Sequence, residues 1–457
     1  MKPEKNLVYQ PFAIISASLA VFITLSFVSI DKEIFGYKIK EVDLFSEIRF
    51  ERKLHETPWP GLVFDQRSKD SLGVMIKLRD RLSVINYTPD KFGAMAKFYE
   101  ALIALENKEG ESIHIGYFGD SMIEGDLLTM DLRNSFQKKF GGRGVGFVSI
   151  TSIVAGFRTT IRHSFSNDWS VYHFNNSGGA DHPAGPSGYS YSAGNGSNVT
   201  YKSTGYSGQF SGIHLYYGAG DSSGVVKSKV NGSEMSSTLD GKDPVNRVVI
   251  HSGSTTGQVN SAFFCRPEQN IYGFSFEGGK GVYLDNYAFR GNSGLALTTV
   301  PKKVYQGFSS LMNYKLIVLH YGLNVVSHDI KDYSWYEKGL KNVIDHLKES
   351  FPEASILVVS VNDKCYRFPT GWETEPDVPI LVETQRKIAE EKQVAFWNLY
   401  ENMGGYNSIK GWVEGDTVYA NKDYTHLNGK GAKQVADMLY GKIMTQYELY
   451  KKMKVKK

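Results

Sequence analysis

The chain has 457 residues, which is more than one hydrophobic core usually organises, so we expect at least two folded units. Hydrophobic residues make up 41% and charged residues 22%, a balance that excludes wholesale disorder. The formal net charge of +4 is small for this length, and the basic residues are dispersed except in the C-terminal tail, so nucleic acid is not an expected partner. Two cysteines, Cys265 and Cys365, exclude a disulfide framework and a cysteine-based zinc site, and two free thiols are favoured over one disulfide.

The N-terminus carries an unusually long apolar run. Residues 6–30 contain no charged side chain, and residues 12–30 are almost wholly apolar, which is long enough to span about 30 Å of hydrocarbon as a helix. The run exceeds the core of a usual signal peptide and lacks a clear cleavage site near Ser29, so an uncleaved anchor is favoured over a signal peptide. Lys2 and Lys5 precede the run and favour a cytoplasmic N-terminus. Residues 1–30 are therefore predicted to anchor the chain, with the remainder outside the cytoplasm in the periplasm or cell envelope.

Residues 31–86 are charged and irregular, and we interpret them as a stem between the membrane and the folded part. A helix is predicted to begin at Thr88, a plausible N-cap, with Pro89 in the first helical position and an apolar stripe behind it.

Short β-branched runs then alternate with helical patterns. The runs are residues 113–118, 316–321, 356–361 and 394–399. One helical pattern follows the first run and ends at Phe140, and the others cover residues 333–350, 381–392 and 430–449. This alternation predicts an α/β unit with a parallel sheet covered on both faces, made from residues 87–147 and 277–457.

Between these two parts, residues 148–276 are rich in Gly, Ser, Asn and Tyr and show hardly any helical period. Strand-like runs at 213–217, 225–230, 247–251 and 271–276 are separated by turn signals, among them Asn231-Gly232 between two alternating runs. The sequence predicts an inserted all-β module, a sandwich or a jelly roll.

The strand at 113–118 ends in Gly119-Asp120-Ser121 and is followed by a helical pattern. In an open α/β sheet the reacting groups gather at the carboxyl ends of the strands, so Ser121 is a candidate nucleophile. The same tripeptide ends at Ser222 inside the β insertion, where no helix follows, and we interpret Ser222 as a turn residue.

A serine nucleophile needs a base, and the base needs an orienting carboxylate. Of the eleven histidines, His426 alone has an aspartate three residues before it, Asp423. Asn324, in Gly322-Leu323-Asn324 after the strand at 316–321, can supply a side-chain amide to a developing oxyanion at the same sheet edge, or can simply cap the next loop.

In this order, the segments around Ser121, Asn324 and His426 resemble blocks I, III and V of the SGNH (GDSL-like) hydrolase superfamily, and residues 284–291 resemble its glycine block II. The resemblance implies a flavodoxin-like three-layer α/β domain. It also implies a nucleophilic Ser121, a basic His426 oriented by Asp423, and no metal or organic cofactor. The oxyanion hole that it implies comprises the Ser121 N–H, the Gly291 N–H, with Gly294 as a second candidate, and the Asn324 side chain.

Residues 88–115 and 403–405 are similar to the subfamily of peptidoglycan and exopolysaccharide O-acetylesterases and O-acetyltransferases, which carry carbohydrate-binding-like modules after block I. Met122 departs from that subfamily, which often has His there. The resemblance implies a serine-dependent carbohydrate O-acetylesterase acting on cell-envelope glycan. Three alternatives remain: an O-acetyltransferase supplied by a membrane-bound O-acyltransferase, a glycan-binding module on an inactive hydrolase scaffold, and a lipase or thioesterase, although the sequence shows no long apolar lid.

Overall fold

The computed structural model describes residues 82–455, apart from residues 177–178, 180, 221–222, 329 and 331. It also gives one antiparallel strand pair, β1 (Glu33–Ile34) and β2 (Tyr37–Lys38), in a unit of residues 1–69 that is separate from residues 70–457. The predicted anchor, most of the predicted stem and Ser222 lie outside the described residues. Within the described part of the chain, no helix is both long and apolar enough to cross a membrane.

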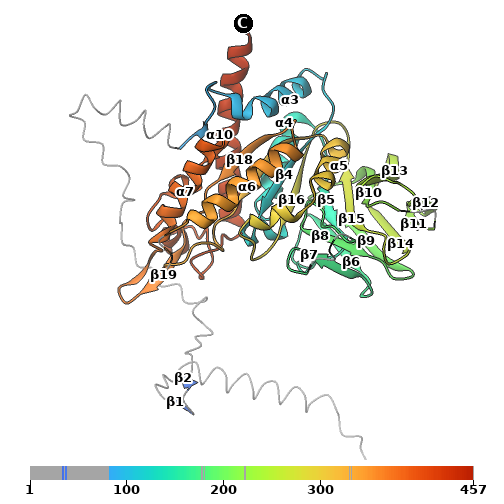
Figure 1. Cartoon of the computed structure of the whole chain (residues 1–457), viewed down its shortest axis with the longest axis horizontal. Coiled ribbons are helices and arrows are strands. Elements are labelled where there is room, and N and C mark those ends of the chain that lie inside the picture. Colours follow the sequence, from blue (N-terminus) through green and yellow to red (C-terminus); the bar gives the residue numbers. More distant parts are fainter. Residues whose placement is uncertain are drawn as a thin grey trace, which may run out of the picture. The chain divides into compact units, whose positions relative to one another are not determined.

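A six-stranded sheet forms the centre of the larger unit (Figure 1). In spatial order its strands are β16 (Val282–Ala288), β4 (Ile113–Gly119), β17 (Tyr314–His320), β18 (Ser355–Val359), β21 (Ala395–Trp397) and β3 (Val84–Asn86). The first five pair in parallel, which confirms the predicted parallel sheet, although β16 was not among the four predicted strands. β3 runs antiparallel to β21. Numbered along the chain, the parallel strands have the order 2-1-3-4-5, so the order reverses between β4 and β17.

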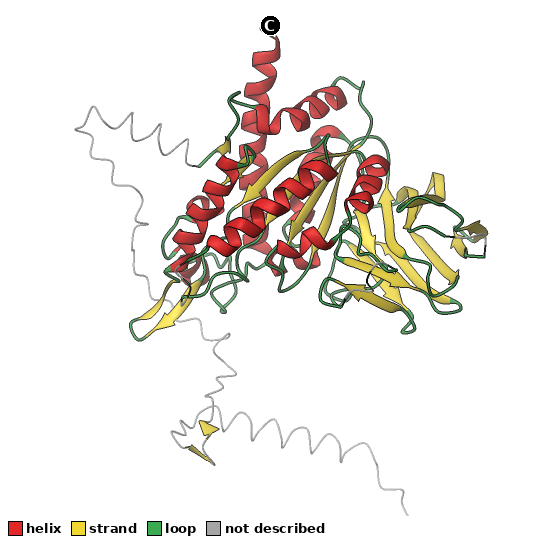
Figure 2. Cartoon of the chain, in the orientation of Figure 1, coloured by secondary structure: helices red, strands yellow, loops and turns green. Residues whose placement is uncertain are grey.

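Helices cover both faces of this sheet, and Figure 1 shows α6 in front of it and α10 behind it (see also Figure 2). One group of neighbouring helices comprises α5 (Lys302–Met312), α6 (Ser334–Ser350) and α7 (Asp377–Glu391). The other comprises α3 (Ala96–Glu106), α4 (Thr129–Phe140) and α10 (Gly429–Val455). Shorter helical segments are η1 (Gly93–Met95), η2 (Ser121–Asp126), η3 (Leu295–Thr299), α8 (Leu399–Met403) and α9 (Ser408–Glu414).

The predicted start of the first helix at Thr88 is wrong. The chain makes a turn there, in which the Phe92 N–H donates to the Asp90 side chain at 3.2 Å, and helical structure begins only at η1. The Thr88 hydroxyl still accepts a hydrogen bond from the Ala94 N–H at 3.1 Å, so it caps the helix from farther upstream.

The residues between α4 and β16 form two antiparallel sheets beside the central sheet (Figure 2). One sheet contains β13 (Asn246–Thr256), β10 (Phe210–Tyr217), β15 (Ile271–Glu277), β8 (Tyr189–Ser192) and β7 (Ser170–His173), with β5 (Gly146–Ser149) paired to β15. The other contains β12 (Ser233–Thr238), β11 (Val225–Val230), β14 (Gln258–Phe264), β9 (Ser197–Ser203) and β6 (Ile161–Phe165). Asn231 and Gly232 form the predicted two-residue turn between β11 and β12, both with positive φ.

The inserted strands have a hydrophobic core of their own, but they also pack on the α/β unit through aromatic rings. Phe147, Tyr216 and Tyr272 surround Phe308 of α5, with ring centroids 5.9, 5.5 and 5.3 Å from its ring. All four side chains are buried, so the insertion shares a continuous apolar contact with the α/β unit.

Cys265 and Cys365 are both free thiols.

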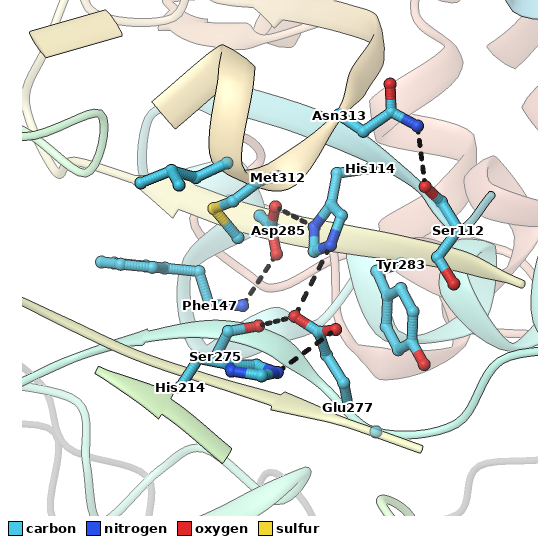
Figure 3. Close-up of polar contacts among 12 residues, drawn as sticks. Ser112, His114, Phe147, His214, Ser275, Glu277, Tyr283, Asp285, Met312 and Asn313 are labelled. Carbon is cyan, nitrogen blue, oxygen red and sulfur yellow. Dashed lines mark hydrogen bonds and ion pairs between the residues drawn. The ribbon is translucent and has the colours of Figure 1, made fainter. Parts of the chain in front are cut away.

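A buried carboxylate ties the two parts together beside these rings (Figure 3). Asp285 of β16 accepts hydrogen bonds from the His114 ring at 2.8 Å, the Tyr314 hydroxyl at 2.7 Å and the Phe147 backbone N–H at 2.7 Å. Burial opposes protonation of His114, but the charge of Asp285, its hydrogen bond and the charge of Glu277 outweigh burial, so the pKa of His114 is raised. The cluster therefore joins β4, β16 and β17 to the first strand of the insertion.

Replacing Asp285 by Ala is expected to lower the free energy of unfolding by about 3 kcal/mol or more, because it leaves His114, Tyr314 and the Phe147 N–H buried without their acceptor. Urea unfolding measures the change. Asp345→Ala is the control, since this carboxylate pairs with Lys392 at the surface and its loss should change stability by less than about 0.5 kcal/mol. Equal losses in the two variants would contradict the structural role of Asp285.

Candidate active site

Ser121 lies directly after β4, where the chain leaves the sheet. The Asp120 side chain accepts a hydrogen bond from the Met122 N–H at 3.0 Å and caps the short segment η2. The sequence predicted a helix immediately after Ser121, and this is only partly correct. A kink at Glu124 and Gly125 interrupts the segment, and the regular helix α4 begins at Thr129.

The kink is held by a buried ion cluster around Asp126, which itself has a positive φ of 71°. Two guanidinium groups bind its carboxylate: Arg133 at 2.8 Å to both oxygens and Arg158 at 2.9 Å. The Thr160 hydroxyl donates at 2.7 Å. Burial alone would raise the pKa of Asp126, but the two arginines hold it well below its usual range. Because Arg158 and Thr160 belong to the insertion, this cluster also fixes the insertion to the loop after Ser121.

Ser121, His426 and Asp423 form a continuous chain of hydrogen bonds. The Ser121 hydroxyl lies 2.9 Å from His426 Nε2, although the two residues are 305 positions apart in sequence. His426 Nδ1 lies 2.8 Å from Asp423 Oδ2, and the Thr425 and His426 backbone N–H groups donate to Oδ1 at 3.0 Å each. Burial works against ionisation of Asp423, but the bonds from His426 and Thr425 prevail and lower its pKa. A carboxylate on Nδ1 leaves Nε2 free to accept the serine proton.

Sheet topology brings Asn324 to the same place. Asn324 follows β17, and β17 is the parallel neighbour of β4 at the point where the strand order reverses, which is where ligands bind in open α/β sheets. Its side-chain amide donates to the Asp120 carboxylate at 2.9 Å and to the Asn292 carbonyl at 3.3 Å. Burial raises the pKa of Asp120 to about 6, against the opposing effect of the Met122 N–H, the charge of His426 and the Asn324 amide.

The loop after β16 brings Gly291 to the site. Gly291 has a φ of +75° and lines the same cleft as Ser121, and a side-chain carbon at this position would meet no atom within 4 Å. Gly294 has a φ of +91°, donates its N–H to the Asn292 side chain at 2.8 Å, and lies against the Tyr321 ring. Of the two glycines considered from the sequence, Gly291 is thus the one that lines the cleft with Ser121.

All five residues singled out from the sequence line one open cleft of about 740 Å³. The walls comprise Ser121, Met122, Glu124, Leu127, Val154, Phe157, Arg290, Gly291, Leu323, Asn324, Lys364, Asn421, Asp423, Thr425, His426 and Leu427. An activated hydroxyl, an oriented imidazole and nearby N–H donors are the groups needed for acyl transfer through a covalent intermediate.

Sequence reasoning missed several of these wall residues. Val154 and Phe157 come from the insertion, and Lys364 comes from the segment after β18. Arg290 forms an ion pair with Glu124, another residue of the lining that is 166 positions away in sequence. None of them has a local sequence signal, because each reaches the cleft only through tertiary packing.

Comparisons with known proteins identify the fold. No protein-family model matches the sequence, and neither does any curated protein sequence. The chain is similar to a solved structure of a peptidoglycan O-acetylesterase, with a TM-score of 0.64, 20% identity, and coverage of 80% of this chain and 99% of that chain. The chain therefore shares the fold of that esterase.

Two further likenesses are weaker. A family two carbohydrate esterase from Cellvibrio japonicus has a TM-score of 0.27 and 9% identity over 63% of this chain and 98% of that chain. An acetyl xylan esterase has a TM-score of 0.28 and 21% identity over 35% of this chain and 80% of that chain. These TM-scores are too low to support an argument about the fold.

The two glycines of the loop after β16 are expected to respond differently to substitution. Gly291→Ala should lower the free energy of unfolding by about 1 kcal/mol through backbone strain alone. Gly294→Ala should cost about 3 kcal/mol, because an added carbon would also lie only 2.8 Å from the Tyr321 ring. Urea unfolding measures both, and Gly441→Ala in α10, with open space and an ordinary φ, should not destabilise. A larger loss at Gly291 than at Gly294 would show that the loop is built differently.

Proposed function

We propose that this chain is an SGNH-type serine carbohydrate O-acetylesterase that removes acetyl groups from cell-envelope glycan, peptidoglycan or exopolysaccharide. The observation that carries the proposal is the hydrogen-bonded chain from Ser121 through His426 to Asp423, which lines a cleft on a fold shared with a peptidoglycan O-acetylesterase. Within this proposal the α/β unit is a flavodoxin-like three-layer domain of residues 87–147 and 277–457. Residues 148–276 are an inserted sandwich-like module.

The proposed reaction is a double displacement. Ser121 Oγ attacks the ester carbonyl carbon while His426 Nε2 takes the hydroxyl proton, and the protonated ring then gives this proton to the departing sugar oxygen. The acetyl group remains on Ser121. A water molecule then attacks the acetyl carbonyl while His426 Nε2 takes its proton. As the bond to Oγ breaks, the protonated ring returns this proton to Ser121 Oγ, and acetate leaves. Asp423 keeps the ring in the orientation and tautomer that both steps require.

The developing oxyanion would be stabilised by the N–H groups of Ser121 and Gly291 and by the Asn324 side chain. The Asn324 amide bonds Asp120 at 2.9 Å and the Asn292 carbonyl at 3.3 Å, and the longer bond is the one that an oxyanion would replace. Asp120 thus acts as the group that holds the Asn324 amide next to Ser121.

The proposed location is extracytoplasmic, with the chain held to the membrane by residues 1–30. The support is the uncharged run of residues 6–30 behind Lys2 and Lys5. A membrane position also suits a transferase, which would receive acyl groups from a membrane-bound O-acyltransferase and pass them from Ser121 to glycan.

The central test compares the wild-type chain with Ser121→Ala, measuring acetate release from p-nitrophenyl acetate and from acetylated glycan, with and without an oligosaccharide acceptor. Ser121→Ala should reduce turnover by about 10⁴-fold or more, because the acyl-enzyme cannot form. The control is Ser310→Ala, a serine exposed on α5, which should keep full activity. Acetyl-oligosaccharide as the main product would instead identify a transferase. Equal inactivity of wild type and Ser121→Ala would favour a glycan-binding protein on a hydrolase scaffold.

Membrane attachment is tested by fractionating cells that produce either the full chain or residues 31–457 behind a cleavable secretion signal. The full chain should remain with membranes after a high-salt or carbonate wash, because a buried apolar helix is insensitive to ionic strength, whereas the shortened chain should be released. Recovery of the full chain in the soluble fraction, shortened at its N-terminus, would indicate a signal peptide.

A further inference from the structure

A loop of the insertion reaches into the catalytic cleft. It consists of residues 150–160, between β5 and β6, and two of its side chains, Val154 and Phe157, line the cleft that contains Ser121. The Phe157 side chain is 57% exposed, a large fraction for an aromatic hydrocarbon side chain. Phe157 therefore presents exposed apolar surface in the cleft where the substrate ester is proposed to react.

The loop is held in one conformation. The N–H groups of Phe157 and Arg158 both donate to the Val154 carbonyl at 2.9 Å, so these residues form a tight turn. Arg158 then binds Asp126 at 2.9 Å and Thr160 at 2.8 Å. Since Asp126 is five residues after Ser121, a buried ion pair fixes the distance between the loop and the nucleophile. A side chain presented in this way loses little conformational freedom when a ligand binds.

The Phe157 ring rests on Gly125. A side-chain carbon built at Gly125 would lie 2.4 Å from Phe157 Cδ1, so only glycine allows this approach, and its φ of +67° also requires glycine. Phe157 is therefore supported from beneath by the backbone of the loop that follows Ser121. It remains open on the side of the cleft.

The lining of the cleft combines apolar and hydrogen-bonding side chains. Phe157, Val154 and Leu127 are among the apolar ones. Arg290, Glu124, Lys364 and Asn421 supply hydrogen-bonding groups elsewhere on its lining. At about 740 Å³ it is within the range of roughly 300 to 1,000 Å³ for sites that bind drug-sized ligands and exceeds what an acetyl group needs. A pyranose ring has the matching chemistry, with apolar C–H groups on its faces and hydroxyls around its edge.

We propose that Phe157, together with Val154, binds the apolar face of the sugar ring that carries the ester. The inserted module then takes part in substrate recognition through this loop, as one wall of the catalytic cleft, and Arg158 is a positioning residue for it. This inference rests on the proposed function and names the part of the molecule that distinguishes a glycan ester from a simple ester.

The inference predicts a split between substrates. Phe157→Ala should raise KM for an O-acetylated chitooligosaccharide by about tenfold. This is the effect expected when the contact of one aromatic face with a sugar ring is lost. It should leave kcat for the oligosaccharide within about twofold, because Phe157 does not take part in the bond-breaking steps. The fall in kcat/KM should be several-fold larger for the oligosaccharide than for p-nitrophenyl acetate, which has no sugar ring. Phe157→Trp, which keeps an aromatic face, should retain most of the affinity for the oligosaccharide.

The matched control is Ile153→Ala. Ile153 lies in the same loop and is 79% exposed, but it does not line the cleft, so its removal should change neither substrate's kinetics. Binding of the oligosaccharide without its O-acetyl groups is measured for the Ser121→Ala variant and for the double variant Ser121→Ala, Phe157→Ala. This readout does not need turnover. Thermal unfolding of each variant checks that the fold is intact.

The possible outcomes separate the two proposals. Serine-dependent hydrolysis with the same oligosaccharide KM in wild type and Phe157→Ala would overturn the role of Phe157 and leave the esterase function standing. Equal losses on both substrates in Phe157→Ala would also overturn it, since a general defect is not recognition of the sugar. If the protein binds the oligosaccharide through Phe157 but Ser121→Ala changes no activity, the sugar site stands and the esterase proposal fails. Neither binding nor hydrolysis by the wild type would overturn both.

Discussion

The structure depends on one buried ion cluster, in which Arg133 and Arg158 share the carboxylate of Asp126. A buried carboxylate is costly unless its charge is neutralised and its oxygens accept hydrogen bonds, and here two cations and two threonine hydroxyls meet that need. Arg133 belongs to the helix after the nucleophile, and Arg158 belongs to the insertion. The same carboxylate therefore fixes the kink behind Ser121 and the loop that carries Phe157. Loss of either arginine would disturb the nucleophile's support and the cleft wall together.

A second buried carboxylate, Asp285, also links the insertion to the α/β unit. It accepts hydrogen bonds from β4, β17 and β5, while the aromatic rings around Phe308 supply apolar contact. Two buried polar clusters and an apolar contact leave little freedom for independent motion of the insertion. Its position relative to the cleft is then a property of the fold, as a wall of a catalytic site requires.

The catalytic groups themselves are arranged by the sheet. Ser121 and Asn324 follow neighbouring parallel strands on either side of the reversal in strand order, and His426 lies on the turn that precedes the last helix. Asp120 links two of them, since it caps the segment of Ser121 and accepts from the Asn324 amide. Its burial, which raises its pKa to about 6, makes this hydrogen-bonded arrangement sensitive to acid. Protonation of Asp120 removes the charge that orients the amide beside the nucleophile.

The sequence by itself determined the alternation of strands and helices, the presence of a β-rich insertion between the two α/β parts, and the residues that meet in the cleft. These features have local causes: hydrophobic period, turn residues such as Asn231-Gly232, and short polar motifs at strand ends. It did not reveal the edge strand β3 or the exposed Phe157 at the cleft, and it placed the first helix too early, at Thr88. Only the tertiary structure decided these features. β3 forms by pairing with β21, and Phe157 is held at the cleft by the bond of its neighbour Arg158 to Asp126 and by its contact with Gly125. Such contacts join residues far apart in the chain, and no local pattern encodes them.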